Sequence, residues 1–349
     1  MASDRKRIVY FKRWMDPVAD RILGAHGDIE VTRLDLDGAG NWPALERAHG
    51  YQSLPKTENT QQWFATRALL ERCPDLLAVC SAGAGYDTID VDACTEAGVI
   101  VCNQAGTNKE AVAEHALGFM LALSKKIAVA DRKIRRGDVG DRWGLMNNDI
   151  RGKTLGIVGI GHIGSQLAKI CRDAFAMPVL AYDPYLSDAQ ITARGASKVG
   201  LDELLQRSDF VSLNCPLTDE TRGMIGAAQF SAMKPGAFFI TTARGGIHDE
   251  AALAAALGSG HLGGAGVDVF DVEPPPADHP LLAFDNVIAT PHVGGITHEA
   301  TYDTASAGAE QWLAIFRGEV PPRLVNPDAW PRYQERFERT FGRRPAALG

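Results

Sequence analysis

The 349-residue sequence lacks several features that would place it in a specialised class of protein. Its six cysteines show no C-x-x-C motif and no paired spacing, which favours reduced thiols and a cytoplasmic location over a disulfide framework. No run of about 18 apolar residues occurs, so we expect no membrane span. The N-terminal residues lead directly into a strand-like segment and show no signal-peptide pattern.

A strong charge of one sign is also missing. The net charge is −7, and Lys, Arg, Asp and Glu are mixed along the chain, so neither nucleic acid nor a membrane is an expected partner. No repeat or low-complexity segment occurs, and no metal site is expected. A chain of this length with 45% hydrophobic residues suits a globular protein of two domains.

The most informative feature that is present is a glycine-rich turn in the middle of the chain. Residues 155–158 indicate a buried strand, and a G-x-G-x-x-G motif follows with glycines at Gly159, Gly161 and Gly164. Apolar residues at helical spacing follow the motif. A second apolar run comes next and ends at Asp183, 19 residues beyond Gly164. This is the pattern of a dinucleotide site, in which a helix N-terminus binds the pyrophosphate and the acid binds the ribose.

Asp183 also indicates which dinucleotide is bound. Its carboxylate would accept hydrogen bonds from a ribose 2′-OH and would repel a 2′-phosphate. Pro184 and Tyr185 follow it, with no nearby arginine for a phosphate. We therefore expect NAD as the cofactor.

Strand-like and helix-like segments alternate, which predicts an α/β fold of two doubly wound parallel sheets. Six strand candidates form a complete Rossmann domain, and because the glycine turn marks the first of them, the preceding segment belongs elsewhere. We expect a smaller, flavodoxin-like substrate domain split between residues 1–103 and 297–349, and a Rossmann domain over residues 104–296. The expected strands are 154–158, 178–182, 209–214, 237–242, 265–270 and 287–290 in the Rossmann domain, and 7–11, 28–34, 76–80 and 98–102 before it.

Three further segments carry predictions. Residues 299–316 predict a helix that packs back on the N-terminal part. Residues 108–126 predict a long helix too apolar to lie exposed, which either packs against a second subunit, giving a homodimer, or is a buried crossover within the chain. Residues 332–349 are polar, rich in arginine and aperiodic, which predicts a loosely held tail.

Three candidate catalytic residues each follow the end of a predicted strand: Arg244, Glu273 and His292. Because the carboxyl ends of parallel strands share one edge of a sheet, the three can converge on one crevice. Arginine can bind a carboxylate and polarise a carbonyl, and histidine can transfer the proton that accompanies a hydride. A carboxylate beside the imidazole stabilises its protonated form.

From about residue 75 to 328 the sequence resembles the D-isomer-specific 2-hydroxyacid dehydrogenases. The family's motifs occur in order: Ala82–Asp90, Asn108–His115, the glycine turn, Cys215–Gly223, and the segments around Arg244, Glu273 and His292. The resemblance implies that His292 is the acid/base, Glu273 its partner and Arg244 the substrate anchor, while the backbone of Ala84 and Gly85 binds the substrate carboxylate. It also implies cofactor contacts by His162 and Ile163 at the pyrophosphate, Asp183 at the ribose, and Thr107, Cys215, Pro216, Thr221, Thr242, Asp268, His292 and Gly295 elsewhere.

The chain departs from the family pattern over residues 48–60. The family usually has a short apolar strand before about residue 55, whereas this segment is polar and is expected to form the wall that selects the substrate side chain. Lys56 either binds a second anionic group of a phosphorylated or dicarboxylic substrate or is a solvated loop lysine. Trp143 either closes the pocket, from the same or the neighbouring subunit, or serves only in packing at an interface.

The resemblance implies an NAD-dependent dehydrogenase that interconverts a 2-oxo acid and a D-2-hydroxy acid. The substrate is expected to be like glyoxylate or hydroxypyruvate, or larger. One alternative is a phosphoglycerate-type dehydrogenase, although the chain stops too early for the C-terminal regulatory domain that many of those enzymes carry. The other is an NAD(H)-sensing protein like the transcriptional corepressors of the family, which the intact Arg244, Glu273 and His292 set disfavours.

Overall fold

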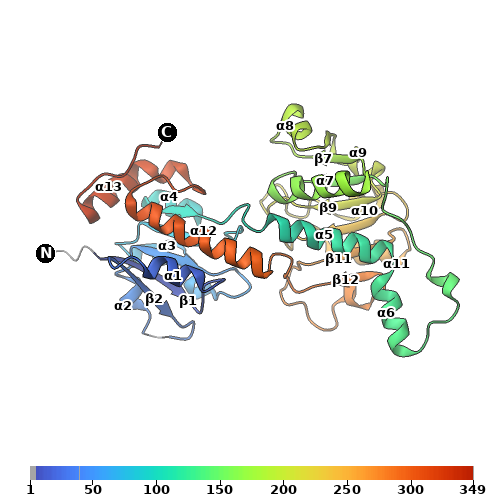
Figure 1. The fold of residues 1–349 in the computed structure, drawn as a ribbon, viewed down its shortest axis with the longest axis horizontal. Coiled ribbons are helices and arrows are strands. Elements are labelled where there is room, and N and C mark those ends of the chain that lie inside the picture. The colour runs from blue at the N-terminus through green and yellow to red at the C-terminus, as the bar shows by residue number, and fades with distance from the viewer. Residues whose placement is uncertain (1–4, 39, 349) are drawn as a thin grey trace. The chain divides into compact units, whose positions relative to one another are not determined.

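The computed structural model describes residues 5–38 and 40–348, which form two compact units (Figure 1). One unit comprises Met1–Asn108 together with Thr297–Gly349, and the other comprises Lys109–Ile296. Residues 1–4, 39 and 349, which the predicted split domain includes, lie outside the described residues. Each unit is a parallel sheet with helices on both faces, which confirms the predicted fold class.

Within the described residues, the unit of residues 109–296 contains seven parallel strands in the order β12-β11-β10-β9-β6-β7-β8. The first strand, β6, is central and the chain winds outward to both sides, as in a Rossmann sheet. Six strands were expected; the seventh, β8, has two exposed residues and is too short to give a hydrophobic pattern. The strands are β6 (Leu155–Val158), β7 (Val179–Tyr182), β8 (Ser197–Lys198), β9 (Phe210–Leu213), β10 (Phe238–Thr241), β11 (Gly264–Val267) and β12 (Val287–Ala289).

Two apolar clusters hold helices on the two faces of this sheet. Side chains of consecutive strand residues point to opposite faces, so Ile157 packs with α5 and α7 while Val158 packs with α9, α10 and α11. A sheet covered on both faces explains why its strands are short apolar runs. The helices are α5 (Lys109–Ser124), α6 (Ile127–Arg136), α7 (His162–Phe175), α8 (Asp188–Ala193), α9 (Leu201–Arg207), α10 (Ala227–Ala232) and α11 (Glu250–Gly258), with short 3-10 helices η2 (Arg142–Leu145) and η3 (Pro280–Ala283).

The other unit contains, among the described residues, five parallel strands in the order β2-β1-β3-β4-β5. They are β1 (Lys6–Phe11), β2 (Ile29–Leu34), β3 (Gly50–Ser53), β4 (Ala78–Ser81) and β5 (Ile100–Cys102). This is the flavodoxin-like order, whose direction reverses between β1 and β3. The helices are α1 (Val18–Gly24), α2 (Trp42–Leu45), α3 (Arg67–Arg72), α4 (Val91–Ala97), α12 (His298–Arg317) and α13 (Trp330–Phe341), with 3-10 helices η1 (Gln61–Trp63) and η4 (Pro327–Ala329).

The central strand β3 lies inside the polar segment that was expected to form only a substrate wall. The segment is a buried strand because its polar side chains have internal partners. The Tyr51 hydroxyl donates to the Trp63 carbonyl at 2.6 Å, and Gln52 Oε1 accepts from Trp312 Nε1 at 2.7 Å. The Ser53 hydroxyl pairs with that of Thr88 at 2.9 Å. The polar residues of this segment are therefore buried in spite of their polarity.

The prediction of a loosely held C-terminal tail is wrong. Residues 330–341 form α13, which places Trp330, Tyr333 and Phe337 at helical spacing in the core against α12 and β1. Full burial of such side chains contributes about 1.5–3 kcal/mol each. Arg336 donates to the carbonyl oxygens of Pro74 and Leu76, both at 2.7 Å. The helix was missed because its aromatic residues are separated by many charged ones on the exposed side.

The apolar helix predicted over 108–126 is α5, and much of its apolar surface is used within its own unit. Ala113, Ala116, Phe119 and Met120 pack in the cluster formed with α7 and the sheet. Glu110, Glu114 and Gly118 are exposed. This packing accounts for much of the apolar surface of α5 within the chain, and a homodimer through this helix stays a prediction.

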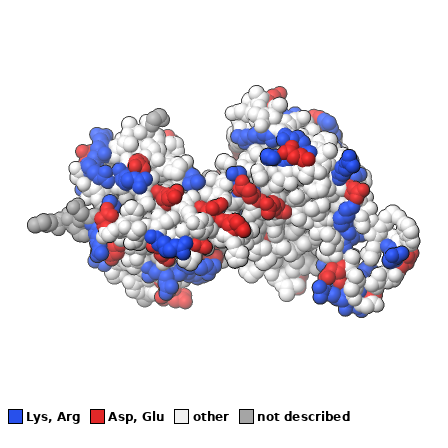
Figure 2. All heavy atoms as spheres, in the orientation of Figure 1, with Lys and Arg blue, Asp and Glu red and all other residues white. Residues whose placement is uncertain are grey.

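No helix of the described chain is long and apolar enough to cross a membrane. Lys and Arg side chains are interspersed with Asp and Glu on the face shown in Figure 2. Such mixing is what the sequence predicts for a chain with modest net charge.

Candidate active site

The three predicted catalytic residues follow three neighbouring strands of the seven-stranded sheet. Arg244 follows β10, Glu273 follows β11 and His292 follows β12, and these strands pair with one another in parallel. Their loops therefore leave the same edge of the sheet. The sequence alone suggested this convergence, and the structure brings the side chains together.

His292 and Glu273 form a direct pair. His292 Nδ1 lies 3.0 Å from Glu273 Oε2, and Glu273 Oε1 accepts from the Phe270 backbone N–H at 3.1 Å. Burial raises the pKa of Glu273, but the hydrogen bond and charge interaction with His292, with smaller effects from Phe270 and Arg244, outweigh it and hold the pKa below its usual value. Because an ionised carboxylate only accepts hydrogen bonds, Nδ1 carries the proton of this contact and Nε2 is left for a substrate.

The backbone of His292 lies in the left-handed region, with φ of 56°. A residue other than glycine keeps this conformation only where its surroundings hold it. Here Asp268 does so: its carbonyl accepts from the His292 N–H at 2.8 Å. Its buried carboxylate accepts from the N–H groups of Val293 and Gly294, each at 2.9 Å, and from the Thr290 hydroxyl.

His115 on α5 completes this support. His115 Nε2 lies 3.0 Å from Thr290 Oγ1 and 3.7 Å from the Asp268 carboxylate. Sequence reasoning missed His115 and Thr290 in this network, because a histidine within an apolar helix is by itself a weak signal. Asp268 was expected at a cofactor contact, and the structure uses its carboxylate to orient the His292 loop.

Arg244 is half-buried at the start of the loop after β10. Its Nη1 donates to the carbonyl of Ala243 at 2.7 Å, which orients the guanidinium close to its own backbone. It is also near enough to Glu273 for its charge to lower the pKa of that carboxyl. A cation, an imidazole and a carboxylate thus meet at one sheet edge, which is the set needed to bind an acid and move a proton.

The glycine turn has the shape that a pyrophosphate requires. A Cβ on Gly159, which has φ of 87°, would lie 2.7 Å from the Cys215 backbone nitrogen, and one on Gly164 would lie 2.5 Å from the Gly159 carbonyl oxygen. A Cβ on Gly161 would instead meet nothing within 4 Å, so the open space is on the ligand side. Helix α7 begins at His162 and directs its first N–H groups there. These residues fit a dinucleotide.

Asp183 lies at the end of β7 beside this turn. Its carboxylate accepts from the backbone N–H groups of Ile160 at 3.3 Å and Tyr185 at 3.2 Å. We expected no arginine near Asp183, and this is wrong for the folded chain. Arg194 Nη1 donates to the carbonyl of Ile160, whose N–H donates to Asp183. The sequence concealed this because α8 separates the two residues.

The remaining expected cofactor residues lie at several places. Cys215 packs against Gly159, and the Thr221 hydroxyl donates to the Pro216 carbonyl at 2.7 Å, shaping the loop after β9. The Thr242 hydroxyl is buried and has no partner among the described residues, which leaves it available to a ligand. Half-buried residues at the remaining expected positions of this unit are Ile163 and Gly295. Thr107 belongs to the five-stranded unit, where its hydroxyl pairs with Thr304 at 2.8 Å.

The expected substrate residues Ala84 and Gly85 form a loop after β4. The Ala84 carbonyl accepts from Asn103 Nδ2 at 2.8 Å, and the Gly85 carbonyl accepts from the Ser81 hydroxyl. Among the described residues neither N–H has an acceptor, so both can bind a carboxylate. Lys56 is exposed on a turn closed by the Glu58 N–H and the Pro55 carbonyl.

Comparisons with known proteins agree with this geometry. Residues 117–294 match the family model for the D-isomer specific 2-hydroxyacid dehydrogenase NAD binding domain. A D-3-phosphoglycerate dehydrogenase of Archaeoglobus fulgidus is 41% identical over 258 residues, covering 74% of this chain but 49% of that protein, so the chain spans about half its length. A glyoxylate reductase of Korarchaeum cryptofilum is 40% identical over 261 residues, covering 74% of this chain and 78% of that protein.

A solved structure shows the same fold over nearly the whole chain. The holo form of D-mandelate dehydrogenase from Rhodotorula graminis superposes with a TM-score of 0.83 at 28% identity, covering 92% of this chain and 97% of that one. The resemblance inferred from the motifs and the expected NAD are thereby confirmed. The chain belongs to the D-isomer-specific 2-hydroxyacid dehydrogenase family and carries that family's NAD-binding domain.

Proposed function

We propose that the protein is an NAD-dependent oxidoreductase that interconverts a 2-oxo acid and a D-2-hydroxy acid. The observation that supports this most strongly is the 3.0 Å contact between His292 and Glu273, next to Arg244, in the unit that bears the dinucleotide turn. A protein that only senses NAD(H) has no need of a paired acid/base aligned with an anion anchor. The family relationship gives the reaction class.

In the proposed mechanism the nicotinamide, when bound, supplies the hydride for reduction and accepts it in oxidation. Gly159, Gly161 and Gly164, with the first turn of α7 at His162 and Ile163, would hold the pyrophosphate, and Asp183 the ribose. Arg244 would bind the substrate carboxylate and polarise the carbonyl oxygen. The N–H groups of Ala84 and Gly85 would bind the carboxylate as well.

His292 would move the proton of this reaction. In reduction Nε2 gives a proton to the carbonyl oxygen, and in oxidation it accepts the proton of the hydroxyl. Glu273 accepts the hydrogen bond from Nδ1 and so fixes which nitrogen faces the substrate. Asp268, Thr290 and His115 would act as positioning residues, because they hold the His292 loop.

The experiment for this proposal is an assay of NADH oxidation at 340 nm with glyoxylate, hydroxypyruvate and larger 2-oxo acids. We expect turnover with NADH and a clear preference for NADH over NADPH, because the Asp183 carboxylate would repel a 2′-phosphate. The proposal is wrong if NADH binds tightly and no 2-oxo acid is reduced, which would instead favour the NAD(H)-sensing alternative. Equal rates with NADPH would contradict the role of Asp183.

We further propose a homodimer formed through α6 and η2, which continue from α5. Ile127, Ile134, Trp143 and Met146 are 56%, 68%, 75% and 65% exposed, an unusual concentration of large apolar side chains. They lie beside a cavity of about 470 Å³ lined in part by Leu145, Phe238 and Ile288. A second copy of this chain is the partner that would cover this face, and Trp143 would pack at the interface.

Sedimentation equilibrium should therefore give a dimer for the wild-type protein. Trp143→Asp should shift it toward monomer, because a buried carboxylate at an apolar interface is costly. The matched control is Val320→Asp, which changes an exposed apolar residue on the other unit. A monomeric wild type, or a fully dimeric Trp143→Asp protein, would contradict this interface. A cytoplasmic location stays a prediction based on the cysteines, and cell fractionation tests it.

A further inference from the structure

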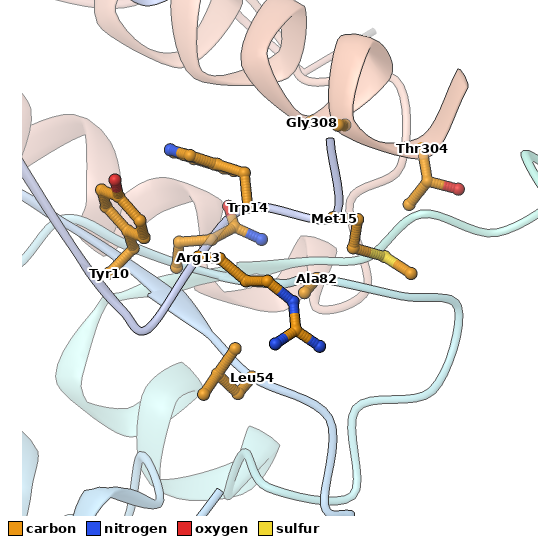
Figure 3. Close-up of a pocket in the computed structure, with 10 residues that line it drawn as sticks. Tyr10, Arg13, Trp14, Met15, Leu54, Ala82, Thr304 and Gly308 are labelled. Carbon is orange, nitrogen blue, oxygen red and sulfur yellow. The ribbon is translucent and has the colours of Figure 1, made fainter. Parts of the chain in front are cut away.

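A cavity lies at the carboxyl ends of three adjacent strands of the five-stranded unit (Figure 3). Arg13, Trp14 and Met15 follow β1, Leu54 follows β3, and Ala82 follows β4. All five line the cavity. The side chain of Arg13 extends toward Leu54 and Ala82, which form the opposite walls.

The position of this cavity is where an open parallel sheet binds a ligand. In the strand order β2-β1-β3-β4-β5 the winding direction reverses between β1 and β3. The loops that leave these two strands diverge to opposite faces of the sheet, which opens a crevice at their carboxyl ends. Arg13 and Leu54 stand on the two sides of that reversal.

The charge of the cavity has one sign. Arg13 is the only charged residue among those that line it within the described part of the chain. Its Nη2 lies 3.1 Å from each carboxylate oxygen of Glu58, which does not line the cavity. The ion pair with Glu58 thus orients the Arg13 guanidinium through Nη2 alone. In the contacts of the described residues, Nη1 and Nε of Arg13 have no carboxylate partner.

The cavity adjoins the loop that the proposed function uses. Ala82 lines it and begins the segment that leads to Ala84 and Gly85, whose N–H groups would bind the substrate carboxylate. A substrate held there would place its side chain toward Arg13. The sequence suggested Lys56 for binding a second anionic group, but Lys56 is not among the described residues that line the cavity.

We propose that Arg13 is the specificity-determining residue of this protein, and that its preferred substrates are short 2-oxo acids with a second anionic group, a phosphate or a carboxylate, on the terminal carbon. The inference rests on the proposed function. The apolar walls formed by Trp14, Met15, Leu54 and Ala82 contact the carbon chain, and the guanidinium binds the anion. The open volume of about 10 Å³ holds about one water molecule, so a substrate chain enters only when the exposed Arg13 side chain and the flexible Met15 side chain move aside.

The test compares matched substrates with and without the second anion. We would measure kcat/KM with NADH for 3-phosphohydroxypyruvate against hydroxypyruvate, and for 2-oxoglutarate against 2-oxopentanoate. The wild-type protein should prefer the member with the second anion in at least one pair by ~10-fold or more. The pair that shows the preference identifies that anion as phosphate or carboxylate. Arg13→Gln should lower kcat/KM for the substrate with the second anion by about 10- to 100-fold, the usual value of a charge-assisted hydrogen bond, while kcat/KM for its partner without that anion changes little.

Two further variants sharpen the test. Glu58→Gln removes the negative charge that competes with a substrate anion but keeps an oxygen that can accept from Arg13 Nη2, so it should lower KM for the substrate with the second anion. Arg67→Gln removes a comparable exposed pair, with Glu96, elsewhere in the same unit and should change neither substrate of a pair. The assignment to Arg13 would be overturned if Arg13→Gln lowered kcat/KM equally for both substrates of a pair. It would also be overturned if Lys56→Gln, and not Arg13→Gln, removed the preference for the second anion.

The outcome also separates this inference from the proposed function. Turnover of glyoxylate or hydroxypyruvate with no preference for the anionic substrates would overturn the role of Arg13 and leave the dehydrogenase activity standing. Absence of turnover with every 2-oxo acid would overturn both.

Discussion

Replacing His292 with alanine should lower the rate of 2-oxo acid reduction by at least ~100-fold, the usual contribution of a positioned acid/base. The variant loses the proton donor at Nε2, and no other described side chain is paired with Glu273 to replace it. NADH affinity should stay near the wild-type value, because the glycine turn and Asp183 are untouched. Stopped-flow measurement of NADH oxidation, with NADH binding followed by fluorescence, gives both quantities.

The control for this variant is a second histidine–carboxylate pair in the same unit. His279 Nε2 also lies 3.0 Å from a carboxylate, that of Glu250, but His279 caps the 3-10 helix η3 and is not one of the residues proposed to contact substrate. His279→Ala should therefore retain most of the activity. Wild-type turnover by His292→Ala, or an equal loss in both variants, would contradict the role given to His292.

Replacing Arg244 with alanine should damage both substrate binding and the chemical step. The guanidinium would contact the substrate carboxylate in the ground state and the carbonyl oxygen as charge develops on it. Loss of charge-assisted hydrogen bonds worth about 1.5–3 kcal/mol each should lower kcat/KM by ~100-fold or more, with KM raised and kcat lowered. Arg244→Lys should recover only part of this, because lysine cannot bind a carboxylate bidentately.

The matched control for Arg244 is Arg207→Ala on α9. Arg207 is exposed and pairs with Glu203 on the same helix, which leads into the amino end of β9, whereas the proposed site lies at the carboxyl ends of the strands. It should leave kcat and KM unchanged. The anchor role is wrong if Arg244→Ala keeps a wild-type KM for every 2-oxo acid.

The geometry of the glycine turn could be predicted from the sequence because that geometry is local. Gly159, Gly161 and Gly164 are fixed by one turn, and Asp183 follows on the next strand, so spacing alone defines their geometry. Arg244, Glu273 and His292 are far apart along the chain, yet each follows a buried apolar run. The rule that parallel strands share a carboxyl edge is enough to place them together.

Features that depend on packing between distant segments could not be predicted in this way. The polar strand β3 is buried because Gln52 meets Trp312 and Ser53 meets Thr88, and neither partner is visible from spacing. Helix α13 is held by aromatic residues that face a core made mainly by the N-terminal strands and helices. The support of the His292 loop by His115, and the approach of Arg194 to the glycine turn, have the same origin.

The most direct test of the account is to identify the product formed from a 2-oxo acid and NADH. Chiral chromatography of the reaction with wild-type protein should show the D-2-hydroxy acid, in an amount matching the NADH oxidised. The His292→Ala protein should bind NADH and form almost none. Formation of the L isomer, or of the D isomer at the wild-type rate without His292, would contradict the central claim.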